Sequence, residues 1–189
     1  MAKPVLTRES FLGGYKRTFE SAELVEATGL SLVFVAEPLG GRSELERALA
    51  GKFGLRLPAP GASSLSDDGK ARMIWLATGQ FLIVFESGEF PETRRIAEEL
   101  GDSAHVGEQT DNWVGLRLSG AAAEEALERI CPVNIAKEAF PVGGVARTAM
   151  EHMGAIAIRE ANDGFLLLSS SSSAKSFLHA VQTSLENIH

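Results

Sequence analysis

The two halves of the chain carry the same order of hydrophobic patterns, and this repeat constrains the fold more than any other feature. In the first half, an apolar run at 31–36 precedes a helical pattern, β-rich runs at 72–78 and 81–86, and a second helical pattern that ends at Gly101. In the second half, the run at 113–118 opens the same series. Four positions on the predicted helix faces correspond, at offsets of 78 to 81 residues: Leu45 with Ala123, Leu49 with Leu127, Ile96 with Phe177, and Leu100 with Val181.

Each half is therefore predicted to be a β-α-β-β-α unit. Such a unit lays two helices on one face of a mainly antiparallel sheet, which is an α+β arrangement. We predict two such pseudo-repeats, at about residues 25–101 and 109–189, with few residue identities between them. A chain of 189 residues has the size of one large domain or two small ones. We expect residues 1–189 to form a single compact unit without a flexible linker.

Polar residues, glycine and proline mark the expected ends of these elements. Ser43 and Glu46 have the spacing of a capping box, which predicts the start of the first helix. Pro91 is expected to open the second helix, and Ser173 is the predicted N-cap of the last one. Residues 57–70 are rich in proline, glycine, serine and aspartate, so we expect an exposed loop there.

Charge and hydropathy exclude several classes of protein. The net charge is −7, and the whole acidic excess lies in residues 61–130, which hold 13 Asp and Glu against 6 Lys and Arg. An acidic chain repels phosphate backbones, so we expect no nucleic-acid binding. The acidic segment is either a solvated surface or a face that meets a basic partner. The longest apolar runs are too short to span a membrane, and no secretory signal opens the chain, so we expect a cytoplasmic protein.

The sequence offers no catalytic, cofactor-binding or metal-binding constellation. Gly40-Gly41 lacks the further residues of a phosphate-binding loop, so a simple strand-to-helix turn is expected. The four histidines have no metal-ligand spacing. Cys131, the single cysteine, is expected to be a buried structural thiol. The serine run 169–173 has no nucleophile-elbow pattern.

Arg147 is the charged residue that we single out. It lies in segment 141–150, whose other residues are apolar or small. An arginine in such a setting needs acceptors, and its planar guanidinium suits a carboxylate or backbone carbonyls. Two interpretations remain open, a salt bridge within this chain or a contact with another subunit.

Four blocks of sequence, spread over most of the chain, together resemble a known family. They are MIWLATGQFLIVF at 73–85, QTDNWVGLRLSG at 109–120, LERICPVNIAKEAFPVGG at 127–144 and ARTAM at 146–150. In this order they resemble the gamma subunit of heterotetrameric sarcosine oxidase, and the resemblance covers about residues 25–186. That family is similar to the folate-binding aminomethyltransferase of the glycine cleavage system. The resemblance therefore implies a truncated form of the aminomethyltransferase fold, without its last domain.

The resemblance also implies a non-catalytic accessory role among alpha, beta and delta partner subunits. In that family, two large subunits carry FAD, FMN, NAD and tetrahydrofolate, a very small one carries zinc, and the gamma subunit has no assigned cofactor. The implied reaction of the assembly is oxidative demethylation of sarcosine to glycine with peroxide production. The one-carbon unit leaves as formaldehyde or passes to tetrahydrofolate. We expect the isolated chain to expose an apolar patch or to self-associate.

Two features depart from the related families. After the last hairpin an Arg-Ser-Phe-like sequence is expected, but this chain has Ser171-Ser172-Ser173, with Phe177 further on. Around Cys131 it reads Ile-Cys-Pro-Val-Asn, without the Lys-Gly-Cys-Tyr signature of folate-dependent iron–sulfur maintenance proteins. No residue set carries over as a folate site. A stand-alone folate-binding or one-carbon-transfer protein remains an alternative, because the related fold binds folate. A degenerate structural module with another partner is a third interpretation.

Overall fold

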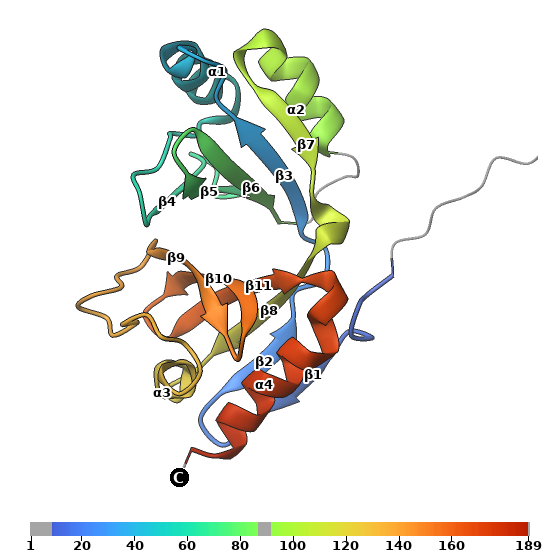
Figure 1. Cartoon of the computed structure of the whole chain (residues 1–189), viewed down its shortest axis with the longest axis vertical. Coiled ribbons are helices and arrows are strands. Elements are labelled where there is room, and N and C mark those ends of the chain that lie inside the picture. The colour runs from blue at the N-terminus through green and yellow to red at the C-terminus, as the bar shows by residue number, and fades with distance from the viewer. Residues whose placement is uncertain (1–8, 87–91, 189) are drawn as a thin grey trace, which may run out of the picture.

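Two antiparallel sheets face each other, and helices cover the outer side of each (Figure 1). The structure is a computed structural model that describes residues 9–86 and 92–188. Strands β3 (Ser31–Ala36), β4 (Ser63–Leu65), β5 (Ala71–Ala77), β6 (Gln80–Phe85) and β7 (His105–Glu108) form the first sheet, in the order β4-β5-β6-β3-β7. Helices α1 (Arg42–Phe53) and α2 (Glu92–Leu100) pack on this sheet, and a short 3-10 helix η1 (Gly101–Ser103) follows α2.

The second sheet has six strands in the order β1-β2-β8-β11-β10-β9. They are β1 (Lys16–Thr18), β2 (Glu23–Glu26), β8 (Trp113–Ser119), β9 (Val145–Met150), β10 (Met153–Ala161) and β11 (Gly164–Ser170). Helices α3 (Ala123–Glu128) and α4 (Ala174–Glu186) cover its outer face. The 3-10 turns η2 (Thr110–Asn112) and η3 (Ser171–Ser173) precede β8 and α4.

The two sheets are built alike, which confirms the α+β prediction of two pseudo-repeats. The orders β4-β5-β6-β3 and β9-β10-β11-β8 place corresponding strands at corresponding positions. The units differ in the strand that follows in each order. In the first sheet, β3 is flanked on its other side by β7, which follows α2. In the second sheet, β8 is flanked on its other side by β2, which comes from the N-terminal part of the chain. The eight matched helix positions are buried, as the periodicity predicts: Leu45, Leu49, Ile96, Leu100, Ala123, Leu127, Phe177 and Val181.

The sheets contain more strands than the three predicted for each unit: β4 and β7 are added in the first sheet, and β1, β2 and β9 in the second. β4 lies inside segment 57–70, which the sequence predicted to be loop throughout, and β9 precedes the predicted second hairpin. Both are edge strands, and β4 is short and partly exposed, so its hydrophobic pattern is weak. The two edges meet, because the backbone N–H of Ser63 donates to the Gly143 carbonyl and that of Val145 donates to the Gly61 carbonyl, both at 2.8 Å.

Apolar side chains fill the space between the sheets. Leu32, Ile74, Leu82 and Val84 from the first sheet pack with Val145, Ile156, Ile158, Leu166 and Leu168 from the second. Burying one such side chain contributes about 1.5–3 kcal/mol. Arg117 of β8 adds an ion pair to Glu86 at the end of β6, so the units are joined by polar contacts as well.

Two of the predicted helix starts differ in detail. Gly41, not Ser43, occupies the N-cap of α1, because its carbonyl accepts the N–H groups of Glu44 and Leu45 at 3.1 and 3.0 Å. Ser173 occupies the N-cap of α4 as predicted, but its side chain makes no capping hydrogen bond. Pro91, the predicted start of α2, lies outside the described residues. None of the described helices has the length and apolar character needed to cross a membrane.

Candidate functional site

Arg147 lies on the edge strand β9 of the second sheet and is exposed. Side chains alternate along a strand, so Arg147 shares the face of Val145, which belongs to the core between the sheets. Its partner in register, Ile156, is buried in that same core. Within the described part of the chain, Arg147 makes no ion pair. The interpretation of Arg147 as an internal salt bridge therefore finds no support.

A cavity of about 200 Å³, here called the Arg147 pocket, opens beside this residue. Two small lining residues, here called its floor, are Gly154, which pairs with Ala149 and is exposed, and Ser170, which pairs with Trp113. A Cβ atom on Gly154 would meet no atom within 4 Å, so the floor is open to a ligand. The full lining is Trp113, Arg147, Thr148, Gly154, Ala155, Ile156, Ser169, Ser170 and Ser173.

The serine run contributes to this pocket and has no nucleophilic arrangement. Ser169 donates to the Gly154 carbonyl at 2.8 Å, and the hydroxyls of Ser170 and Ser172 lie 2.8 Å apart. Hydroxyls that bond to backbone or to each other stabilise the turn between β11 and α4. The sequence singled out Arg147 and the serine run separately, and the sheet register brings the two together.

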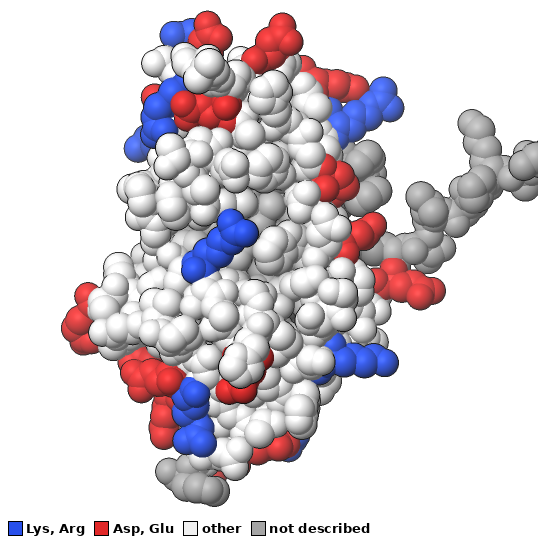
Figure 2. Space-filling model, in the orientation of Figure 1, with Lys and Arg blue, Asp and Glu red and all other residues white. Residues whose placement is uncertain are grey.

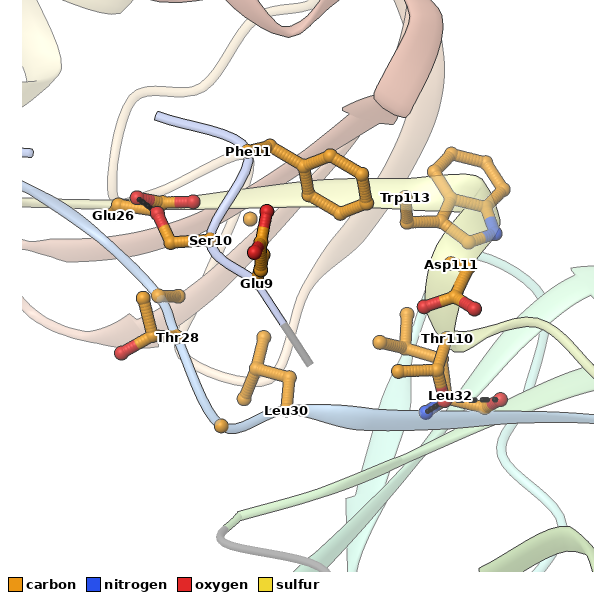
Figure 3. A pocket seen from close by; sticks show the side chains of 13 residues that line it. Glu9, Ser10, Phe11, Glu26, Thr28, Leu30, Leu32, Thr110, Asp111 and Trp113 are labelled. Carbon is orange, nitrogen blue, oxygen red and sulfur yellow. Dashed lines mark hydrogen bonds between the residues drawn. The ribbon is translucent and has the colours of Figure 1, made fainter. Parts of the chain in front are cut away.

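A second cavity, of about 280 Å³, lies where the N-terminal segment crosses the link between β2 and β3 (Figure 3). Phe11 and Trp113 face each other across its upper side, and Thr110 and Asp111 line the end that leads into β8. The indole nitrogen of Trp113 lies on the side of the ring turned away from Phe11. That Nε1 atom is buried and has no hydrogen-bond partner among the described residues.

Glu26 is the buried carboxylate of this second cavity, and sequence reasoning missed it. It is 6% exposed and accepts hydrogen bonds from the Ser10 hydroxyl at 2.5 Å and from the backbone N–H groups of Leu12 and Gly14 at 3.1 and 2.8 Å. All three donors lie in residues 10–14, so the Glu26 carboxylate anchors the N-terminal segment to β2. The alternating pattern of β2 did not reveal it, because two of the three donors are backbone N–H groups.

A third cavity, of about 380 Å³, lies between α4, the end of α3 and the turn from β9 to β10. Its lining includes Arg129, Glu151 and His179. No hydrogen bond or ion pair joins these three side chains in the part of the chain that the structure describes. They therefore form no acid–base or nucleophilic arrangement of the kind that catalysis needs.

Arg159 is the buried arginine of this fold, and the sequence analysis did not select it. It is 1% exposed, and its Nη2 donates to Glu124 Oε2 at 2.7 Å and to the Ile135 carbonyl. Its Nη1 donates to the Asn162 carbonyl. These contacts tie β10 to α3 and to the loop after α3, which is a structural role.

The remaining predicted positions provide no reactive group. Cys131 is buried, and this burial raises the pKa of its thiol, which disfavours the thiolate. His105 and His152 are exposed, and His189 lies outside the described residues. Among residues 9–86 and 92–188, no group of three or more His, Cys, Asp and Glu is placed to hold a metal ion.

One protein-family profile matches most of the chain. The profile described as "Sarcosine oxidase, gamma subunit family" matches residues 42–186, which include parts of both units. No curated protein gives a match to the sequence.

Two solved structures are similar to this chain over most of its length. A chain of the heterotetrameric sarcosine oxidase from Corynebacterium sp. U-96 is 21% identical, with a TM-score of 0.77, over 90% of this chain and 87% of that one. The glycine cleavage system aminomethyltransferase T from Bartonella henselae is 17% identical, with a TM-score of 0.58, over 85% of this chain and 45% of that one. The fold is therefore the one that the sequence resemblance implied, in a form that spans less than half of the aminomethyltransferase.

Proposed function

The chain belongs to the sarcosine oxidase gamma subunit family, and from this membership we propose that it acts as a non-catalytic accessory subunit of a heterotetrameric sarcosine oxidase. The observation that carries the proposal is the family match over residues 42–186. The three cavities described above hold no nucleophile with a paired base among the described residues, which is compatible with an accessory role.

The reaction proposed for the assembly is the oxidation of the N-methyl group of sarcosine. Two electrons pass from sarcosine to O₂, which becomes hydrogen peroxide. Water then releases glycine and formaldehyde from the oxidised substrate, or the one-carbon unit passes to tetrahydrofolate. We place FAD, FMN, NAD and tetrahydrofolate on partner subunits and no cofactor on this chain.

The proposed partners are the alpha, beta and delta subunits of the oxidase, in the cytoplasm. Support comes from the similar solved structure, which is described as heterotetrameric. Figure 2 shows a broad, largely uncharged area over the junction of the two sheets, with most charged side chains toward the rim of that face. Charged residues are depleted at the centre of subunit interfaces, so this area suits a docking surface. We also propose that residues 1–189 act as one compact unit and that Arg147 is an interface residue.

A stand-alone folate-binding or one-carbon-transfer protein is not favoured. The alignment with the sarcosine oxidase chain spans 87% of that chain, whereas the alignment with the aminomethyltransferase spans 45% of the enzyme. A protein acting alone in one-carbon transfer would need the substrate site of the whole enzyme.

Co-expression with the other subunits of the oxidase tests the proposal. We expect this chain to elute with them in size-exclusion chromatography, and the complex to produce peroxide from sarcosine. The isolated chain should show only aromatic absorbance and no oxidase activity. A chain that elutes alone in the presence of the other subunits, or that carries stoichiometric flavin, would contradict the proposal.

A further inference from the structure

The Arg147 pocket has the composition of an anion-binding site. Its lining holds a guanidinium group, an indole ring and several hydroxyls, and it holds no Asp or Glu. A guanidinium group binds a carboxylate through two parallel N–H···O bonds, which fixes the position of the carboxylate as well as attracting it.

Arg147 is one of five arginines, among the eleven in the described residues, that make no ion pair; the others are Arg47, Arg56, Arg72 and Arg129. The chain has an acidic excess, with a net charge of −7, so carboxylates are available for pairing. Six arginines do pair with a carboxylate of this chain: Arg17, Arg42, Arg94, Arg95, Arg117 and Arg159. Arg147 has no such pair among the described residues, although it lies in the middle of an ordered strand.

Trp113 adds a second unused donor beside the pocket. Its indole Nε1 is buried without a partner in the described residues, and a buried donor that lacks an acceptor costs free energy. The Trp113 ring lines both this pocket and the second cavity, and its Nε1 atom has almost no exposed surface. A carboxylate that enters the pocket would therefore lie against the ring rather than bind Nε1.

The position of the pocket favours an occupant that belongs to another chain. The N–H of Val145 points away from β10, toward Gly61, so the N–H and C=O groups of Arg147, two residues on, point to the same edge of β9. The part of this edge beyond Val145, which has no backbone partner among the described residues, is here called the free edge of β9. Unpaired edge groups are sites where another chain docks. The volume of about 200 Å³ is below the range of about 300–1,000 Å³ of most small-molecule pockets, but it accommodates a single acidic side chain.

We propose that the Arg147 pocket receives a carboxylate side chain of a neighbouring subunit, presented by a segment that runs along the free edge of β9. The carboxylate pairs with Arg147 and lies against Trp113. This inference rests on the proposed function, because it needs an assembly partner, and it adds the chemistry that the partner must present.

The test compares the affinity of variants of this chain for the other subunits of the oxidase. Arg147→Met removes the charge, and Gly154→Val fills the floor without changing any charge. We expect either variant to raise the dissociation constant of the complex about tenfold or more, as for the loss of an interfacial charge pair. Arg94→Met and Gly107→Val are the matched controls: Arg94 is an exposed arginine of α2, and Gly107 lies in β7 with room for a Cβ atom. Both controls should stay within about twofold of wild type.

Two further measurements make the outcome decisive. Thermal unfolding of each isolated variant checks that the chain folds, and tryptophan fluorescence during an acetate titration reports binding of a free carboxylate. Wild-type affinity for both Arg147→Met and Gly154→Val would overturn the inference and leave the proposed function intact. Failure of the wild-type chain to assemble would overturn both. A saturable acetate response that requires Arg147, with unchanged assembly, would assign the pocket to a small carboxylate and refute the subunit contact.

Discussion

Replacing Arg159 by methionine should destabilise the chain far more than the same change at Arg147. The Arg159 guanidinium donates to Glu124 and to the carbonyls of Ile135 and Asn162, and its central carbon lies 4.4 Å from the Phe165 ring centroid. Methionine keeps the apolar stem of the side chain but provides no donor. The variant would leave the Ile135 and Asn162 carbonyls without the donor that Arg159 provides. Arg159 is 1% exposed, so this donor is buried.

These contacts set the expected magnitude. Each buried acceptor left without a donor costs about 1–3 kcal/mol. Glu124 is 28% exposed at its side chain, so water can replace part of its ion pair. The Nε atom of Arg159 already lacks a partner in the described residues, so the variant also removes one unsatisfied donor. We therefore expect a loss of about 3 kcal/mol, near the lower limit for breaking a buried pair.

Urea denaturation of the isolated chain measures this loss. In a chain of this size about 3 kcal/mol corresponds to a fall in Tm of about 6–12 °C. Arg147→Met, the matched control, should change the free energy of unfolding by less than about 0.5 kcal/mol, because Arg147 is exposed. A loss below 1 kcal/mol for Arg159→Met, or an equal loss for both variants, would refute the distinction between a structural and a free arginine.

Two further substitutions test the backbone and a polar network. Gly120 has φ +113°, and a Cβ atom there would lie 2.5 Å from the Ser21 carbonyl oxygen. Gly120→Ala should therefore destabilise the chain by about 2 kcal/mol or more, as measured by urea denaturation. Gly154→Ala, the control, should be nearly neutral, because a Cβ atom at Gly154 would meet no atom within 4 Å. Glu108 is partly buried, which would raise its pKa, but hydrogen bonds from Thr110 and Thr93 outweigh burial and lower it. A lowered folded-state pKa gives stability that is present above the unfolded pKa of about 4.3 and is lost as the pH falls through the folded value. Thr110→Val should therefore destabilise the chain more at pH 7 than at pH 3, and an equal loss at both would contradict this.

The helix faces were predictable from the sequence because their signal is local. Leu45, Leu49, Phe177 and Val181 recur at the spacing of a helix face, and all four are 0% exposed. The strands β4 and β9 were not predictable in this way. An edge strand is half exposed and pairs on one side only, so its residues need not be apolar, and β4 reads Ser-Ser-Leu.

The candidate site shows a different limit of sequence reasoning. Arg147 stands among small and apolar residues, yet it is exposed because its strand lies at an edge. Arg159 ends the run Ala-Ile-Ala-Ile of β10, a strand with neighbours on both sides. A continuous apolar run indicates a strand that is buried on both faces, so a charge at its end was a usable signal for a buried arginine. Local composition did not distinguish the exposed Arg147 from the buried Arg159, because burial depends on strand order.

The position of β2 explains why the two units should behave as one. β2 pairs with β8 in the second sheet, and its Leu24 is fully buried in the core beneath α3 and α4. After β2 the chain reaches β3 of the first sheet within four residues, so the two sheets share one short connection at this point. A fragment that begins at about residue 109 would lack the strand beside β8 and would expose that edge. The second unit is therefore completed by residues that precede the first, and we propose that neither unit is separable from the other.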